Sequence, residues 1–305
     1  MSFEYDFGGF KSGFVTLVGR PNAGKSTLLN AIMGKKIAIT SNTAQTTRHR
    51  FRAVRTTADY QLILVDTPGI HKPHDALGEE LNTSAIKALE DVDVVAMLVD
   101  SSQPVGTGDE WVAAQLKKLD TSKVLVMSKT DLVDEAVLAE QMELAEKLAD
   151  WDAVVCCSAT ENDNVDGFID QVVSLLPEGP QWFPADMETD QPLEVIVAEF
   201  IREKILRSFR DEIPHAIGVQ TEELKYSRKK DLYSIRAIIY VEHESQKGMI
   251  IGKRGQAIKR IGSEARQDLE HMLGARAYLD LSVKLKKNWR RDASQIRRFG
   301  YGEGA

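Results

Sequence analysis

The strongest chemical signal in the sequence is the octet Gly19-Arg20-Pro21-Asn22-Ala23-Gly24-Lys25-Ser26, which fits the pattern G-x-x-x-x-G-K-[ST]. An apolar run, Phe14–Val18, precedes the octet, and a helical pattern that starts at Thr27 follows it. Backbone N–H groups of such a turn and of the helix start can converge on phosphate oxygens. We expect Lys25 to neutralise the β- and γ-phosphates and the Ser26 hydroxyl to bind Mg²⁺. The octet and Thr27 therefore predict a nucleoside triphosphate site.

A polar loop is predicted to sense the terminal phosphate. Residues 40–50 show neither a helical nor a strand period, which is typical of a surface loop. A threonine hydroxyl from such a loop can complete the Mg²⁺ shell. Thr47 is our choice over Thr46 for this role.

A second loop follows the buried strand Tyr60–Val65. It begins Asp66-Thr67-Pro68-Gly69-Ile70, and a carboxylate at this end of a strand faces the ligand crevice of an open α/β sheet. We expect Asp66 to hold a Mg²⁺-bound water and the Gly69 N–H to contact the γ-phosphate. Ile70, also expected beside the nucleotide, has an apolar side chain that cannot orient water, so intrinsic hydrolysis is predicted to be slow. The predicted catalytic groups are Lys25, Thr47 and Gly69.

The nucleotide base is predicted to lie against Ser128-Lys129-Thr130-Asp131, which follow the strand Lys123–Met127. The Asp131 carboxylate can accept hydrogen bonds from both N1–H and the exocyclic amine of guanine, whereas adenine offers no such pair of donors. The Lys129 stem can lie along the base and ribose. The pair Ser158-Ala159, after a further strand, is expected to face the guanine O6. These residues predict GTP and GDP as ligands, with Mg²⁺.

Strand and helix patterns alternate through the first half of the chain, which predicts a doubly wound, mostly parallel α/β sheet. Hydrophobic residues make up 43% of the chain, and no apolar run is long enough to span a bilayer. The N-terminus lacks the basic and apolar segments of a signal peptide. Cys156 and Cys157 are adjacent on an apolar run and predict buried, reduced thiols. We expect a cytoplasmic protein with one larger and one smaller domain.

Charge is unevenly divided along the chain. From residue 192 onward 23 Lys and Arg stand against 16 Asp and Glu, whereas residues 1–191 hold 16 against 30. This basic surplus favours a nucleic-acid partner for the second half, although a merely solvated face can have the same composition. Four prolines fall within residues 177–192, which indicates a domain boundary. The predicted domains are residues 1–178 and 193–305, joined by a linker at 179–192.

The second half predicts a smaller α+β domain. Its patterns run helix, strand, strand, helix, helix, strand, and Ile251-Gly252-Lys253-Arg254-Gly255 joins the last two helices. The G-x-x-G form in this order of elements is typical of a prokaryotic KH domain, whose loop clamps single-stranded nucleic acid. We therefore expect RNA binding by residues 251–255 and Lys259, with a protein-interaction domain as the alternative. In the basic tail, Trp289 and Phe299 either stack on nucleotides or pack on the domain.

Taken together and in this order, the motifs resemble those of the bacterial Era family, GTPases that act in maturation of the small ribosomal subunit. The resemblance covers nearly the whole chain, and its specific marks are Gly19–Ser26, Ala44-Gln45-Thr46-Thr47-Arg48, Asp66–Gly69, Lys129 with Asp131, Ser158-Ala159 and Gly252–Gly255. It implies a nucleotide-dependent switch that binds small-subunit ribosomal RNA near its 3′ end and assists assembly of the small ribosomal subunit. It also implies partial peripheral contact with the cytoplasmic face of the plasma membrane. We expect a monomer.

One residue departs from the family pattern. Ser128 stands where family members usually carry Asn, whose amide ties the base-binding loop to the phosphate loop and to the base. Ser is shorter, so we expect guanine preference to survive through Asp131 with some loss of nucleotide affinity. Two other functions stay open. One is an RNA chaperone whose nucleotide is only a structural ligand, and the other is a membrane-surface GTPase that meets anionic lipid instead of RNA.

Overall fold

The computed structural model describes residues 7–41, 43, 46–68, 76–89, 91–209, 213–299 and 301. Contacts among these residues divide the chain into two compact units. The first unit holds the described residues of 7–38, 47–68 and 81–190, and the second holds those of 39–46, 76–80 and 191–301. The domain boundaries at residues 178 and 193 stay a prediction. The loop segment 39–46 groups with the C-terminal half of the chain.

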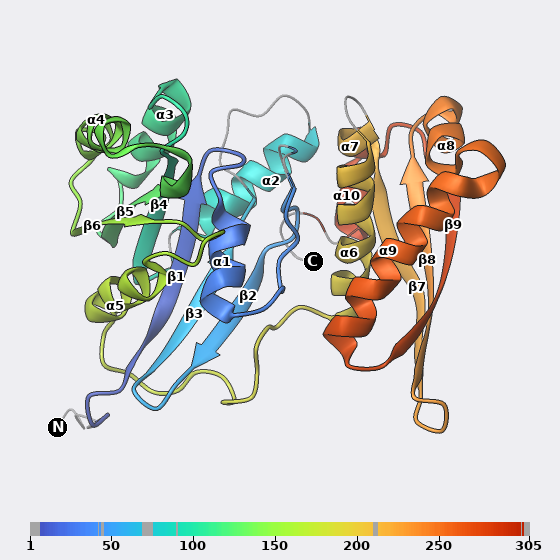
Figure 1. The fold of residues 1–305 in the computed structure, drawn as a ribbon, viewed down its shortest axis with the longest axis horizontal. Coiled ribbons are helices and arrows are strands. Elements are labelled where there is room, and N and C mark those ends of the chain that lie inside the picture. Colours follow the sequence, from blue (N-terminus) through green and yellow to red (C-terminus); the bar gives the residue numbers. More distant parts are fainter. Residues whose placement is uncertain are drawn as a thin grey trace. The chain divides into compact units, whose positions relative to one another are not determined.

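The first unit is built on a six-stranded sheet in the order β2-β3-β1-β4-β5-β6 (Figure 1). β2 is antiparallel to β3, and every other neighbouring pair is parallel. The strands are β1 (Lys11–Gly19), β2 (Phe51–Thr56), β3 (Tyr60–Asp66), β4 (Val94–Asp100), β5 (Ser122–Ser128) and β6 (Ala153–Cys157). The prediction of a doubly wound, mostly parallel α/β sheet is confirmed.

Helices cover both faces of this sheet. Val94, Ala96 and Leu98 of β4 join an apolar cluster that includes residues of α1 and α5, whereas the intervening Val95 and Met97 join a cluster with α2, α3 and α4. The helices are α1 (Lys25–Met33), α2 (Ala76–Lys87), α3 (Thr107–Leu116), α4 (Glu135–Glu146) and α5 (Val165–Leu175). Because both faces are buried, the central strands are continuous apolar runs.

The edge strand β2 has no counterpart among the predicted strands. Its outer side is covered by the end of the segment predicted as a linker. The Val54 N–H donates to the Glu188 carbonyl oxygen at 2.9 Å, and the Arg52 N–H donates to the Asp190 carboxylate at 2.8 Å. Residues 188–190 therefore cover a strand edge that would otherwise be open to pairing with another chain.

The second unit has a three-stranded sheet with helices on one face (Figure 1). β8 is antiparallel to β7 and parallel to β9. Ile261, Ala265 and Leu269 follow one another at intervals of four and form the buried stripe of α9. The elements are α6 (Leu193–Ser208), α7 (Ile213–Ala216), β7 (Gly218–Ser227), β8 (Leu232–Val241), α8 (Glu244–Ile251), α9 (Gln256–Leu273), β9 (Arg276–Leu285) and α10 (Ala293–Arg298). The predicted order of the KH domain is confirmed, with α7 and α10 in addition.

The C-terminal aromatic residues pack within this unit. Trp289 and Tyr301 are fully buried, and the Trp289 Nε1–H donates to the Ala216 carbonyl at 3.0 Å. The Phe299 ring lies 4.9 Å from the Trp289 ring and 5.1 Å from the Tyr240 ring of β8. Of the two interpretations of this tail, packing on the domain is therefore correct for Trp289 and Phe299, and stacking on nucleotides is wrong.

Candidate nucleotide and RNA sites

The phosphate loop joins β1 to α1 at the carboxyl end of the sheet. Gly19 has φ +147°, and a Cβ at this position would lie 2.5 Å from the Leu98 carbonyl oxygen, so only glycine fits. Gly24, also at positive φ, stands directly before the first turn of α1. The loop can therefore direct its N–H groups and those at the start of α1 toward one anion.

Two side chains of the octet bond inside the first unit. Lys25 Nζ donates to the carbonyl oxygens of Gly19 at 3.2 Å and Arg20 at 3.1 Å. The Arg20 guanidinium forms an ion pair with the buried Asp109 of α3, with Nε 2.9 Å from the carboxylate. Arg20, predicted to contact the cofactor, can thus offer its backbone to a phosphate while its side chain holds α3 against the loop. The sequence analysis did not predict a role for Asp109.

Three oxygen-bearing side chains from separate segments meet beside the phosphate loop. Ser26 Oγ lies 3.0 Å from Thr47 Oγ1, and Asp66 Oδ2 accepts from Thr47 at 3.2 Å and from Ser26 at 3.4 Å. Asp66 Oδ1 is buried and has no hydrogen-bond partner within the described part of the chain. Hydroxyl and carboxylate oxygens with one buried acceptor unpaired fit Mg²⁺. The Thr46 hydroxyl, by contrast, bonds within its own loop.

Burial works against both charges at this site. It raises the pKa of the Asp66 carboxyl to about 6, although Lys25 and hydrogen bonds from Thr47 and Ser26 oppose the rise. It also lowers the pKa of Lys25 to about 8, opposed by the Asp66 charge. A phosphate near Lys25 and a cation near Asp66 would each restore the charged form. The electrostatics therefore favour an anionic ligand together with a metal ion.

The rest of the Asp66 loop is only partly described. Thr67 and Pro68 are buried, and the Thr67 hydroxyl lies 3.4 Å from the Leu17 carbonyl oxygen of β1. Gly69 and Ile70 lie outside the described residues, so their contact with the nucleotide stays a prediction.

A cavity of about 170 Å³ lies where the guanine base is predicted. Asp131 lines it, and its Oδ1 accepts from the Ser158 hydroxyl at 2.6 Å. Lys129 also lines it, and its Nζ pairs with the Asp100 carboxylate at 2.6 Å. The lining residues are Gly24, Thr27, Leu28, Ser128, Lys129, Asp131, Leu132, Cys157, Ala159 and Thr160. The structure thus brings the predicted base-binding residues of two strand ends to one cavity.

Four of these lining residues were not predicted, namely Leu28, Leu132, Cys157 and Thr160. Cys157 and Thr160 flank the predicted Ser158-Ala159 pair, so the position along the strand was the signal that could have found them. Burial raises the pKa of the Cys157 thiol to about 12, and both cysteines are free thiols. Cys157 therefore faces the cavity as a neutral thiol, although Cys156, expected to be buried, is half-buried.

Ser128 reaches further than its length suggests. Its Oγ lies 2.8 Å from the Ala23 carbonyl oxygen of the phosphate loop and 3.0 Å from the Val99 carbonyl oxygen of β4. The hydroxyl has one hydrogen and donates to one of these acceptors at a time. The residue at this position therefore ties β5 to the phosphate loop even without an amide.

The predicted RNA-binding loop connects α8 to α9 in the second unit. Gly252 has φ +72°, and a Cβ there would lie 2.7 Å from the Ala257 Cβ, so glycine is required. Lys253 and Arg254 follow it and are exposed to solvent. Two exposed cations on a tight glycine turn fit a sugar–phosphate backbone.

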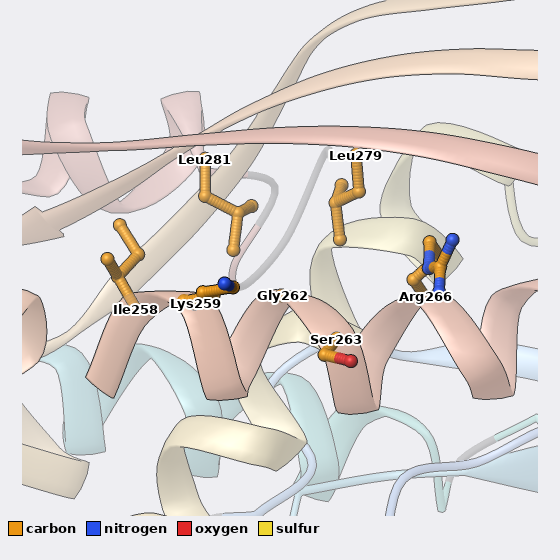
Figure 2. A pocket seen from close by; sticks show the side chains of 7 residues that line it. All are labelled: Ile258, Lys259, Gly262, Ser263, Arg266, Leu279 and Leu281. Carbon is orange, nitrogen blue, oxygen red and sulfur yellow. The ribbon is translucent and has the colours of Figure 1, made fainter. Parts of the chain in front are cut away.

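A groove of about 340 Å³ runs between α9 and β9 (Figure 2). Lys259 and Arg266 of α9 border it with their cations, and Leu279 and Leu281 of β9 supply apolar surface from the other side. A Cβ on Gly262 would lie 3.3 Å from Leu281 Cδ1, so glycine keeps the groove open at this point. Cations beside apolar side chains suit an unstacked nucleotide. Of these residues only Lys259 was predicted.

Comparisons with known proteins agree with this geometry. A family model described as a 50S ribosome-binding GTPase matches residues 14–129, and a KH domain model matches residues 212–290. GTPase Era of Alkaliphilus metalliredigens (strain QYMF) is 46% identical over 292 residues, which cover 96% of this chain and 99% of that protein. GTPase Era of Thermoanaerobacter sp. (strain X514) is 47% identical over 293 residues, covering 96% and 97%. The chain belongs to the GTPase Era family.

Solved Era structures extend the likeness to three dimensions. An Aquifex aeolicus Era variant bound to GDP·AlF4⁻ is 37% identical with a TM-score of 0.92, covering 96% of this chain and 100% of its own. Era in complex with MgGDPNP and nucleotides 1506–1542 of 16S ribosomal RNA has the same identity and TM-score and covers 96% and 99%. As an Era-family member, the chain is a magnesium-dependent GTPase that uses GTP and GDP.

Proposed function

We propose that the chain is a GTP-driven switch that binds small-subunit ribosomal RNA near its 3′ end and assists assembly of the small ribosomal subunit. The observation that carries the proposal is the meeting of Ser26, Thr47 and Asp66, because it places a loop residue where a bound nucleotide and its metal decide the loop's position. The RNA partner is supported by the basic turn and groove of the KH unit. It is also supported by the related Era complex with 16S ribosomal RNA.

The residues of the nucleotide site have distinct proposed roles in hydrolysis. Mg²⁺ supplies charge neutralisation at the phosphate oxygens. Ser26 and Thr47 would hold it directly, and Asp66 would hold it through water. Lys25, the phosphate-loop N–H groups and the Gly69 N–H stabilise the charge that builds on the phosphate oxygens. No side chain acts as a general base in this proposal, so turnover is slow until RNA or the ribosomal subunit helps to position water.

Base selection is proposed to rest on Asp131. Its carboxylate lines the cavity and would pair with the two donors of guanine, while the Ala159 N–H would meet O6. Ser158 holds the Asp131 carboxylate at 2.6 Å and so fixes its direction. An adenine nucleotide would leave this carboxylate unpaired, which costs a few kcal/mol, on the order of 2 kcal/mol or more.

The proposed division of labour between the two units can be tested in the full chain. Lys25→Ala is expected to abolish tight GTP binding and to leave binding of a short single-stranded RNA intact, as measured by titration with fluorescent GTP and labelled RNA. Lys117→Ala, at an exposed position at the end of α3, is the matched control and should change neither affinity. Equal loss of both activities in Lys25→Ala would contradict a separate RNA-binding domain.

We also propose residues 1–178 and 193–305 as the functional domains, with a monomer in the cytoplasm and a fraction in peripheral contact with the plasma membrane. None of the helices within the described ranges is long and apolar enough to cross a membrane. Contact would therefore use the basic surface of the second unit. Light scattering tests the monomer. Flotation with anionic vesicles tests the contact, and binding that ignores RNA competition would favour a membrane-surface GTPase.

A further inference from the structure

The first helix of the second unit, α6, holds the loop segment 39–46. Ile39 is buried in the apolar cluster that α6 shares with β8 and α9. The Thr40 N–H donates to Glu203 Oε1 at 3.0 Å, and Arg207 Nη2 donates to the Thr40 hydroxyl at 3.0 Å. At the other end of the segment, Arg202 Nη2 donates to the Thr46 carbonyl oxygen. Both ends of the segment are therefore bonded to α6.

Arg202 is a rigid donor in this arrangement. Its side chain is fully buried, and Glu199 binds its Nε at 2.8 Å and its Nη2 at 2.6 Å. A guanidinium held at two nitrogens by one carboxylate has a fixed plane, so the second Nη2 hydrogen has a fixed direction. The Thr46 carbonyl accepts this hydrogen. The position of the Thr46 backbone is thereby set by α6.

Thr46 and Thr47 are consecutive but have different partners. The Thr46 carbonyl bonds to Arg202, whereas the Thr47 hydroxyl contacts Ser26 and Asp66. Consecutive Cα atoms are a fixed distance of about 3.8 Å apart, so a shift of one residue is passed to the next. We propose that Arg202 is a positioning residue, which holds the Thr46 carbonyl and so places the Thr47 hydroxyl in the Mg²⁺ site. The inference rests on the proposed role of Thr47 in that site.

A purely structural role for Arg202 predicts a different outcome. The pair of Arg202 with Glu199 would then stabilise α6, and its loss would lower thermal stability without changing the demand for Mg²⁺. A positioning role acts through the metal site. Loss of a group that orients a metal ligand typically costs about 10- to 100-fold in metal affinity or activity. The two roles are therefore separated by the Mg²⁺ concentration that half-saturates GTP hydrolysis.

The test uses the full chain with Glu199→Gln and Arg202→Met combined, which removes both charges and leaves no unpaired one buried. We expect half-saturation to require at least about tenfold more Mg²⁺. GDP affinity in EDTA should stay within about twofold of wild type, because Thr47 acts only through the metal. Thr47→Ala should show the same shift, and adding it to the double variant should cause no further change. Arg202→Lys, which keeps a charge opposite Glu199, should fold and give an intermediate shift.

Arg290→Gln is the matched control in the same unit. Arg290 pairs with the buried Glu242 at 2.8 Å, so its loss should lower stability without moving the Mg²⁺ curve. Normal wild-type turnover with an unchanged Mg²⁺ curve in both Arg202 variants would overturn this inference alone. So would additive shifts from Thr47→Ala and the double variant. Absence of Mg²⁺-dependent turnover in the wild type would overturn the proposed function and this inference with it.

Discussion

Replacing Ser128 by Ala should weaken nucleotide binding by cutting the tie between β5 and the phosphate loop. Ser128 Oγ lies 2.8 Å from the Ala23 carbonyl oxygen, and Ala23 is 1% exposed, so water has little access to replace the lost donor. A buried acceptor left unsatisfied costs about 1–3 kcal/mol. If the whole cost falls on the binding-competent loop, the Kd for GDP should rise about 5- to 150-fold.

Calorimetric titration with GDP measures this change directly. Ser174→Ala is the matched control, because the exposed Ser174 hydroxyl also donates to a backbone carbonyl, that of Gln171 at 2.7 Å, far from the nucleotide in the sequence. It should leave the Kd unchanged. Ser128→Asn, which restores the residue usual in the family, should bind GDP at least as tightly as the wild type. A Ser128→Ala protein that binds GDP like the wild type would show that the phosphate loop keeps its shape without this bond.

Three further perturbations separate the base reader, the RNA groove and the buried charges. Asp131→Asn should reduce the preference for GTP over ATP at least about 100-fold and favour xanthosine nucleotides, because an amide accepts one hydrogen and donates another; unchanged preference in competition binding would exclude Asp131 as the base reader. Arg266→Ala should weaken single-stranded RNA binding and lower its log–log salt slope by about 0.7 without changing GDP affinity, whereas Arg260→Ala, outside the groove lining, should not. GDP binding at pH 8 should take up about half a proton, since Lys25 has a pKa of about 8 and binds phosphate when charged. Mg²⁺ loading at pH 6 should release about half a proton more than in Asp66→Asn, whose wild-type carboxyl has a pKa of about 6; identical heats in buffers of different ionisation enthalpy would contradict both statements.

The phosphate loop and the sheet were predictable because their signals are local. The spacing of Gly19, Gly24 and Lys25 specifies a turn between one strand and one helix, whatever the rest of the chain does. The apolar runs of the central strands reflect burial on both faces. By contrast, β2 lies at an edge and is covered by residues 188–190, which no local pattern links to it.

Contacts between distant segments limited the prediction of the sites. The reach of Ser128 depends on how closely β5 approaches the phosphate loop, which its length alone does not give. Arg266 and Leu281 line one groove only because the register of β9 places them opposite α9. The burial of Trp289 depends on a carbonyl of α7, 73 positions earlier in the chain. Composition identified the basic half, but only the fold separates its exposed cations from its packed aromatic residues.

Helix α6 contacts both functional parts of the second unit. Its Arg202 holds Thr46, and its Lys204 pairs with Asp268 of α9 at 2.5 Å, on the helix that borders the RNA groove. A 16-residue helix does not bend between adjacent turns without losing backbone hydrogen bonds, so a shift of Thr46 must stretch its bond or move α6 against α9. Thermodynamic linkage requires that RNA strengthen GTP binding by the factor by which GTP strengthens RNA binding. Asp268→Asn should reduce that common factor while leaving each affinity, measured alone, near the wild-type value. An unchanged factor would exclude the contact of α6 with α9 as the route of coupling.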